Sequence, residues 1–413
     1  MNLLFLNPAG SPGGAERALL DVMASLAAAR PGWRLGLIAA ADGVLVEEAR
    51  AMGVDAAVVK FPRAVSLLGD AAAGGPAGDH TNPLAVAGRV AAAAPAIASY
   101  TRALRRAIAE RAPDAIHTNG FKMHVLGAWA APRATPLIWH LHDYVRARPM
   151  MSRLLRAHAG RTAAIIANSH SVADDARRLF GGRANVLAVH NAVDLERFSP
   201  AGHALDLDRL AGLPPLGEGG VRVGLMATLA RWKGHRTFLR ALADLPAHSP
   251  VRGYVIGGPL YETAGSQHAL EDLRGYAGAL GLDGRAGFTG FVADAPAALR
   301  ALDIVVHAST EPEPFGLVIA EAMACGKPVI ASAAGGAGEL FADGSEALSH
   351  KPGDAAELAR AIARLAADRA LRLRLGAAAA AAARHRFTRA RLAAELIPIY
   401  ERAVGAKRTR PAA

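Results

Sequence analysis

The chain has 413 residues, of which 52% are hydrophobic and 20% are charged, a composition that excludes a disordered protein and indicates two or three folded domains. Its single cysteine, Cys325, excludes an internal disulfide, and we expect it to be a core residue in a reducing compartment. The net charge is +11, but aromatic residues make up 5% and no basic stripe is interleaved with them, which argues against nucleic-acid binding. The positive net charge is better explained by binding of an anionic substrate or of an anionic membrane surface.

The chain shows no sign of a membrane span or a signal peptide. No segment reaches the ~18 continuous apolar residues of a spanning helix. Residues 1–7 lack a basic start and instead predict a first strand, so we expect a cytoplasmic protein.

The first half alternates between short apolar runs and helical patterns, which predicts βαβ units and a parallel sheet. The expected strands are residues 3–6, 35–39, 56–59, 115–117, 137–142, 163–167 and 186–189. A helix is expected over 15–30, and a mobile loop over 66–83, which is rich in Gly, Ala and Asp.

A glycine-rich loop, residues 7–14, precedes the first helix and contains Gly13 and Gly14. Such a loop can bring a phosphate to bare backbone N–H groups at the helix N-terminus. It does not follow G-x-G-x-x-G and lacks a suitably placed acidic residue, so a dinucleotide site is not expected. The alternative is a simple turn.

Two polar segments follow expected strands of this half. A strand over 137–142 places His140 and His142 on one face, where a structural role is the alternative to ligand binding. Ser169 or Ser171 can cap the helix that follows, and a cap alone is as good an explanation as a ligand.

The second half starts after a linker over 200–220 that holds Asp206 and Asp208. This D-x-D triplet could bind a metal, but such triplets are common by chance and this one lies between domains. A strand over 221–226 then leads to a loop with Arg231 and Lys233. Arg and Lys beside a glycine suit a diphosphate, while a solvated basic loop is the alternative.

Two carboxylates mark the most informative stretch. A strand over 304–306 ends in a loop with Glu313, and the helix expected over 317–325 carries Glu321 about two turns in. Ligands of open α/β sheets collect at the carboxyl ends of strands, so the two can grip separate parts of one elongated ligand. Both could instead be solvated, but Glu321 lies in an almost wholly apolar helix and needs a partner.

The segment from Glu313 to Glu321, EPFGLVIAE, resembles the E-x7-E signature of the family 4 retaining glycosyltransferases, which have the GT-B fold. The segment from Asn191 resembles the family's N-G-V-D motif, with Ala192 replacing the usual glycine. The resemblance implies an α/β fold of two Rossmann-like domains facing a central cleft, with the last helix crossing back to the first domain. The implied divisions are 1–198 for the acceptor, 199–386 for the nucleotide sugar, and 387–413 for the last helix and a disordered tail that includes 407–410.

The resemblance also implies a function: transfer of a sugar from a nucleotide diphosphate sugar, with retention and without a metal or other cofactor, in cell-envelope or polysaccharide synthesis. The implied donor-binding residues are Gly14, Arg231, Lys233, Gly290, Glu313, Phe315, Gly316, Leu317 and Glu321. The implied acceptor-binding residues are Gly13, Gly14, Asn119 and His142, and the catalytic ones are His142, Arg231, Lys233 and Glu313. The alternatives are a nucleotide-sugar epimerase, a sugar phosphorylase and a non-catalytic nucleotide-sugar-binding subunit. The acceptor and the oligomeric state stay open.

Arginines cluster in two expected helices of the first half, together with apolar side chains. A basic amphipathic helix can lie on an anionic membrane, as family members that glycosylate lipid-linked acceptors do, which would give weak peripheral contact at the inner face of the plasma membrane. A surface helix packed on its own core is the alternative. The residues are Arg102, Arg105, Arg106, Arg146, Arg148, Met150, Met151, Arg153, Leu154, Leu155, Arg156 and Arg161.

Overall fold

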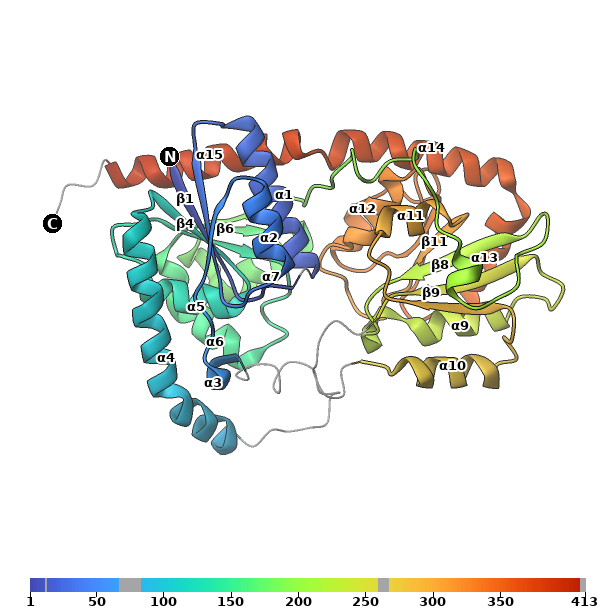
Figure 1. Ribbon diagram of the computed structural model, residues 1–413, viewed down its shortest axis with the longest axis horizontal. Helices are drawn as coiled ribbons and strands as arrows, with labels where there is room; N and C mark the ends of the chain where they lie inside the picture. Colours follow the sequence, from blue (N-terminus) through green and yellow to red (C-terminus); the bar gives the residue numbers. More distant parts are fainter. Residues whose placement is uncertain (12, 67–82, 259–266, 409–413) are drawn as a thin grey trace. The chain divides into compact units, whose positions relative to one another are not determined.

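The computed structural model describes residues 1–413 with the exception of 12, 67–82, 259–266 and 409–413. The chain divides into two compact units (Figure 1). Unit 1 consists of Met1–Ala192 and Arg389–Ala413, and unit 2 of Val193–Thr388. The two units therefore divide after Ala192 and Thr388, whereas the resemblance implied divisions after residues 198 and 386.

Unit 1 is built on a seven-stranded parallel sheet of order β3-β2-β1-β4-β5-β6-β7. Its strands are β1 Asn2–Asn7, β2 Arg34–Ala39, β3 Asp55–Val58, β4 Ala115–Asn119, β5 Leu137–Leu141, β6 Thr162–Ala167 and β7 Val186–Ala188. Every predicted strand of this half is confirmed. The order reverses between β1 and β4, and polar residues after these strands meet at one sheet edge.

Helices cover both faces of the unit 1 sheet (Figure 1). They are α1 Gly14–Ala29, α2 Val44–Ala51, α3 Arg63–Ser66, α4 Pro83–Arg111, α5 Phe121–Ala130, α6 Pro149–His158, α7 His170–Phe180 and α15 Arg389–Arg408. The final helix α15 packs beside α1 and contributes Leu392, Leu396 and Tyr400 to the core of that face. The predicted return of the last helix to the first domain is confirmed.

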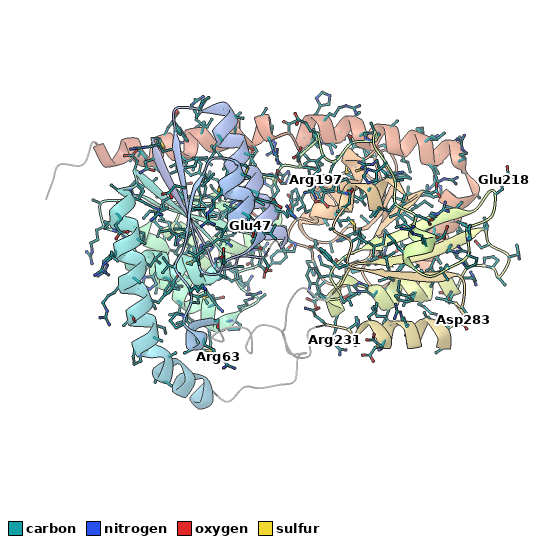
Figure 2. All side chains as sticks on the ribbon, viewed as in Figure 1. Glu47, Arg63, Arg197, Glu218, Arg231 and Asp283 are labelled. Atoms are coloured by element: carbon teal, nitrogen blue, oxygen red, sulfur yellow. The ribbon has the colours of Figure 1, made fainter. Side chains whose placement is uncertain are left out.

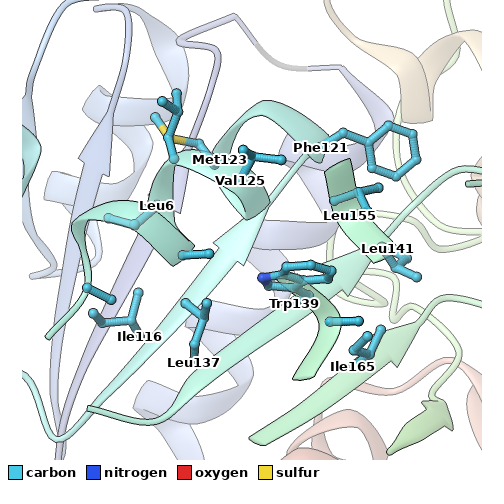
Figure 3. Close-up of a cluster of buried hydrophobic side chains, with 14 of the residues drawn as sticks. Leu6, Ile116, Phe121, Met123, Val125, Leu137, Trp139, Leu141, Leu155 and Ile165 are labelled. Carbon is cyan, nitrogen blue, oxygen red and sulfur yellow. The ribbon is translucent and has the colours of Figure 1, made fainter. Parts of the chain in front are cut away.

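Alternate residues of the strands enter two separate cores, as the two-residue side-chain period requires. One core gathers around the fully buried Trp139 of β5, with Leu141, Leu155 and Ile165 nearby (Figure 3). Ile138 enters the opposite core, which α1 and α15 cover. His140 shares the strand face of Ile138.

Unit 2 repeats the architecture with a six-stranded parallel sheet of order β10-β9-β8-β11-β12-β13. Its strands are β8 Val221–Met226, β9 Val251–Ile256, β10 Ala286–Gly290, β11 Ile304–His307, β12 Val329–Ser332 and β13 Leu348–His350. Its helices are α8 Leu207–Leu210, α9 His235–Ala243, α10 Leu270–Ala279, α11 Ala295–Arg300, α12 Leu317–Ala324, α13 Ala355–Ala367 and α14 Arg369–Arg386. Two Rossmann-like domains are thus confirmed.

Three local expectations differ from the structure or lie outside it. Glu321 lies about one turn into α12, not two: the helix starts at Leu317 as expected, and the four residues from there to Glu321 make only one turn. Helix α15 continues through Arg408, so residues 407 and 408 are helical and not part of a disordered tail. Of the loop expected over 66–83, residues 67–82 lie outside the described residues. No helix of the described part is both long and apolar enough to cross a membrane.

Candidate active site

The loop between β8 and α9 carries the two predicted diphosphate ligands. Arg231 and Lys233 begin and end a 3-10 turn, and the Arg231 side chain is exposed at the surface of unit 2 (Figure 2). Gly234 follows with φ of +75°, and a Cβ there would collide with the carbonyl group of Ala308. Only glycine permits both this conformation and this approach. Gly234 therefore lets the loop lie against the chain that leaves β11.

That approach brings Lys233 to Glu313, which is 7% exposed. The Lys233 ammonium donates to both carboxylate oxygens, at 3.0 and 2.9 Å. The Ser309 hydroxyl donates to Oε2 at 2.8 Å, and Nε2 of His307 lies 3.2 Å from the same oxygen. Because an ionised carboxylate only accepts hydrogen bonds, His307 must carry its proton on Nε2 to bind it.

Backbone hydrogen bonds also hold Glu313 in place. Its N–H donates to the carbonyl of Ala334 at 3.1 Å, and its own carbonyl accepts from the Gly336 N–H at 2.8 Å. The loop after β11 is thereby tied to the glycine turn after β12, and Glu313 cannot move without breaking both bonds.

The charge of Glu313 depends on its neighbours. Burial alone would raise its pKa, but the charge of Lys233 and the hydrogen bonds from His307 and Lys233 outweigh burial and hold the pKa well below its usual range. Glu313 is therefore ionised at neutral pH and suited to accept hydrogen bonds from hydroxyl groups.

The other predicted donor residues of unit 2 differ in burial and in structural role. Phe315 is 3% exposed and meets Phe387 edge-on at 6.2 Å, so its side chain serves the core. Gly316 caps α12 with φ of +90°, and Leu317 opens that helix. Glu321 is half-buried on α12. Gly290 ends β10, where its carbonyl accepts from the Gly257 N–H at 2.9 Å.

Two of the predicted acceptor residues of unit 1, Gly13 and Asn119, are linked by a buried chain of hydrogen bonds through Glu16 and Asn7. Gly13 caps α1, and its N–H donates to Oε2 of Glu16 at 3.1 Å. The Asn7 amide donates to Oε1 of Glu16 at 3.3 Å, and the Asn119 amide donates to Oδ1 of Asn7 at 2.7 Å. Burial raises the pKa of Glu16. A Cβ on Gly14 would meet nothing within 4 Å, so packing within the described residues does not require glycine there.

His142 lies one residue beyond β5 and is half-buried. Its Nε2 has no hydrogen-bond partner among the described residues, and burial lowers its pKa to about 4. Its ring centroid lies 4.1 Å from that of His140. The Ser169 hydroxyl accepts from the Val172 N–H at 3.1 Å, which confirms this serine as the cap of α7.

The structure gives Asp206 and Asp208 structural partners. Asp206 caps α8 by accepting from the Arg209 N–H at 3.0 Å. Asp208 is 3% exposed, and its carboxylate binds Arg222 at 2.7 Å, Arg252 at 2.6 Å and the hydroxyl of Tyr254. These bonds occupy the carboxylate that a metal would need.

Sequence reasoning missed His307, Ser309, Asn7 and Glu16. The available signal was spacing. His307 and Ser309 are polar residues two apart where a β-branched run ends, and such residues share a side of an extended chain. Glu16 stands three residues after the cap Gly13, the spacing at which a glutamate reaches back to the backbone N–H of the cap.

A second feature of unit 1 is its basic surface, which we define as the exposed side chains of α4, α6 and the end of α5. Met150, Leu154 and Trp129 are 46%, 42% and 37% exposed, while Leu155 is fully buried and Met151 packs on the core. Met150, Leu154 and His158 follow one another at four-residue spacing on α6, and the Trp129 indole donates to Nε2 of His158 at 2.9 Å, so Trp129 lies beside the end of this row. The arginines of this surface are Arg102, Arg105, Arg106, Arg153 and Arg156.

The part of the chain that contains the basic surface is rich in positive charge. Residues 83–161 contain twelve basic and three acidic residues, against a net charge of +11 for the whole chain. A groove beside Trp129 is lined by residues of α4, mostly apolar or basic: Ala94, Ile97, Ala98, Thr101, Arg102 and Arg105.

Comparison with known families covers both units. Residues 216–382 match the family described as glycosyl transferases group 1, and residues 12–197 match glycosyltransferase family 4. The lipopolysaccharide core biosynthesis glycosyltransferase LpsE of Rhizobium meliloti is 30% identical over 62% of this chain and 68% of its own length. The chain belongs to glycosyltransferase family 4. The resemblance found in the sequence is thus confirmed.

Other relatives of this family 4 chain carry different names. The D-inositol 3-phosphate glycosyltransferase of Xylanimonas cellulosilytica is 30% identical over 74% of this chain and 77% of that protein. The Stackebrandtia nassauensis protein of the same name is 35% identical over 53% of this chain, and the match spans about half, 49%, of its length.

Solved structures place the family 4 chain in the GT-B fold. Anabaena Alr3699/HepE in complex with UDP matches with a TM-score of 0.75 and 28% identity, over 96% of this chain and 99% of that one. The same protein in complex with UDP-glucose matches with a TM-score of 0.75 and 27% identity, over 99% and 100% of the chains.

Proposed function

We propose that this protein is a retaining, metal-independent hexosyltransferase that takes its sugar from a nucleotide diphosphate sugar. The observation that carries the proposal is the pairing of Lys233 with the buried Glu313 beside the exposed Arg231. It puts cations for a diphosphate next to an ionised acceptor for sugar hydroxyls, at the carboxyl ends of β8 and β11. The UDP and UDP-glucose bound to Alr3699/HepE support a nucleotide sugar as the donor class.

In this proposal, charge that develops on the leaving diphosphate is neutralised by protein cations. Arg231 offers a planar fork and Lys233 a compact ammonium with three donors, so Lys233 can serve a phosphate and Glu313 together. Preorganised cations of this kind supply the stabilisation that a divalent metal supplies elsewhere. No resident cofactor enters the reaction.

The remaining donor residues hold the parts of the nucleotide sugar that do not react. Glu313 and the backbone amides of Phe315, Gly316 and Leu317 bind the transferred sugar, and Glu321 accepts from the ribose hydroxyls. Gly290 faces the nucleobase through its backbone, and Gly14 leaves room for the diphosphate. Gly13, Asn119 and His142 bind the acceptor or the transferred sugar.

Retention in this proposal comes from the resemblance to the family 4 retaining glycosyltransferases, and no carboxylate of the matched motifs is assigned as a covalent nucleophile. Glu313 is engaged by Lys233, Ser309 and His307 and serves as a hydrogen-bond acceptor. The acceptor hydroxyl then attacks the anomeric carbon on the face that the diphosphate leaves. The C–O bond to the diphosphate breaks, the new glycosidic bond forms, and the hydroxyl proton passes to the departing phosphate oxygen.

Incubation with a panel of nucleotide sugars, starting with UDP-glucose, tests the proposal. We expect slow hydrolysis of one donor, with release of the nucleoside diphosphate and of a sugar whose first anomer matches the donor. Release of the inverted anomer would contradict retention. Binding of a donor without any turnover, with or without added sugar and polyol acceptors, would instead favour a non-catalytic subunit.

We also propose that the basic surface gives weak peripheral contact with an anionic membrane on the cytoplasmic side. Each basic residue near such a surface contributes ~1 kcal/mol, and exposed Met150, Leu154 and Trp129 supply apolar groups for the headgroup boundary. The acceptor would then be a lipid-linked or envelope glycan.

Flotation with vesicles of phosphatidylcholine and phosphatidylglycerol at low salt tests the contact. We expect co-flotation that is lost at high salt and in a Met150→Ser/Leu154→Ser variant. The matched control is Leu373→Ser, which removes a 59% exposed leucine from unit 2. Absence of the wild-type protein from the lipid fraction at low salt would overturn the membrane proposal and leave the transferase proposal intact.

A further inference from the structure

His140 is a buried polar residue that the donor and acceptor assignments leave without a task. It is 1% exposed, and neither ring nitrogen has a hydrogen-bond partner within the described parts of the chain. A buried polar group without a partner destabilises the folded state, so such a position calls for an explanation.

The neighbours of the His140 ring suggest one. Its centroid lies 4.1 Å from that of His142, at an interplanar angle of 40°. The His117 ring of β4 also contacts it, with a centroid distance of 5.2 Å and an edge-on angle of 84°. His140 therefore contacts both the imidazole at the end of β5 and one on the neighbouring strand.

The His117 ring is itself anchored to the last helix. The Tyr400 hydroxyl of α15 lies 2.7 Å from its Nδ1, and Phe5 of β1 packs on it at 5.1 Å. Tyr400 is fully buried and meets Trp33 edge-on at 6.3 Å. Tyr400, His117, His140 and His142 form a continuous line of rings from α15 to the end of β5, which we call the imidazole column.

The column can be packed tightly because its rings are neutral at neutral pH. Burial, reinforced by the charge of His142, lowers the pKa of His117 to about 3, and burial lowers that of His142 to about 4. The column is not a proton path, since the nitrogens of His140 make no hydrogen bond to either neighbour among the described residues. The rings of His117, His140 and His142 can therefore fix one another's positions only through packing contacts.

We propose that His140 and Tyr400 are positioning residues, which hold the His142 ring in place through the imidazole column. The inference rests on the proposed function, in which His142 contacts the transferred sugar or the acceptor. It gives α15 a task beyond closing the core of unit 1, because a helix from the end of the chain would then set the geometry of a site residue. Misplacement of a reacting group by about 1 Å can cost ~100-fold in rate.

Three substitutions distinguish the shape of the His140 ring, its nitrogen atoms and the anchoring hydroxyl of Tyr400. His140→Ala removes the ring, His140→Phe keeps a flat ring without nitrogens, and Tyr400→Phe removes only the hydroxyl. We expect His140→Ala to lower kcat for UDP-glucose hydrolysis ~10-fold to ~100-fold with nucleoside diphosphate affinity unchanged. His140→Phe should restore most of the rate, and Tyr400→Phe should fall between them.

A spectroscopic readout distinguishes positioning from a loss of stability. In the free full-length protein, the ring ¹H–¹⁵N signals of His142 should shift in His140→Ala and in Tyr400→Phe. The matched control is His124→Phe. His124 is equally buried but stacks on Trp139 in the other core, so this variant should leave the His142 signals and kcat unchanged.

The outcomes keep the two proposals apart. Full activity in His142→Ala would overturn the task proposed for His142 itself. If His142→Ala is inactive while His140→Ala and Tyr400→Phe keep both kcat and the His142 signals, the column is refuted and the proposed function stands. Should His140→Ala not fold, His140→Phe and Tyr400→Phe decide through the same two readouts.

Discussion

The Lys233 ammonium lies 2.9 Å from the carboxylate of Glu313, a residue 80 positions further along the chain. Side-chain exposures of 19% and 9% make this a largely buried pair, which Ser309 and His307 complete on the carboxylate side. A buried ion pair adds little net stability to the fold, but removal of one partner is costly because it leaves the other charge buried and unpaired. The loops after β8 and β11 are therefore held together as one element, with the Lys233 ammonium fixed on the carboxylate of Glu313.

Removal of either cation should lower turnover sharply. We expect Arg231→Ala or Lys233→Ala to reduce kcat ~100-fold or more in the donor-hydrolysis assay, the usual scale for one preorganised charge donor. Arg240→Ala is the matched control, since it removes an exposed arginine of α9 that pairs with Asp244. Near-normal turnover in both Arg231→Ala and Lys233→Ala would refute the phosphate assignment.

Activity should survive chelation. Two protein cations already face the proposed diphosphate, and Asp206 and Asp208 are engaged by a helix N-terminus and by arginines. Donor hydrolysis in excess EDTA should match the untreated rate. Complete loss that magnesium or manganese restores would contradict this and return attention to carboxylate ligands.

Much of the fold could be predicted because each strand is a short apolar run between turn residues. The strands on either side of Glu313 and the helix with Glu321 were evident in this way. The partnership of Lys233 with Glu313 was not, because periodicity contains no information on which loops approach each other. Gly234 decides that approach, through a positive φ and a contact with Ala308 that appear only in three dimensions.

Buried polar partners were the least predictable part. In the sequence, Asp208 is the second aspartate of a D-x-D triplet of a kind that is common by chance. Its partners in the structure are Arg222 on β8 and Arg252 and Tyr254 on β9. Tyr400 could be predicted to dock from its helical spacing, but not to bind His117 with its hydroxyl. Such pairings depend on strand order and helix placement, which a local pattern does not encode.

Gly234→Ala should damage both stability and turnover. The new Cβ collides with the Ala308 carbonyl and the positive φ adds strain, so we expect a loss of about 2 kcal/mol or more in the free energy of unfolding. Displacement of Lys233 should also lower kcat. Gly275→Ala is the control, since a Cβ inside α10 meets nothing within 4 Å and should stabilise by ~0.5–1 kcal/mol. Equal behaviour of the two variants would contradict the close approach of the loops.

Stability should fall as the pH drops below about 6.5. Burial lowers the pKa of His117 and His235 to about 3 and that of His142 to about 4, while the same groups in the unfolded chain titrate near ~6.5. At a pH between the folded and the unfolded pKa of a group, the unfolded state binds more protons than the folded state. Each such group therefore lowers the free energy of unfolding by about 1.4 kcal/mol per pH unit as the pH falls.

Thermal unfolding between pH 7.5 and 5 measures this slope. His235→Leu should reduce the slope because it removes one of the buried groups, and the same change at the exposed His385 serves as the control. A melting temperature that does not change over this range would contradict the assignment of neutral buried imidazoles.

The most direct test of the central claim is calorimetric titration of the full chain with UDP, GDP and ADP. We expect at least one nucleoside diphosphate to bind with one site per chain. We also expect Lys233→Ala to weaken this binding at least ~10-fold while Arg240→Ala leaves it unchanged. Binding of none of the three, or equal binding by wild type and Lys233→Ala, would contradict a diphosphate site on Arg231 and Lys233.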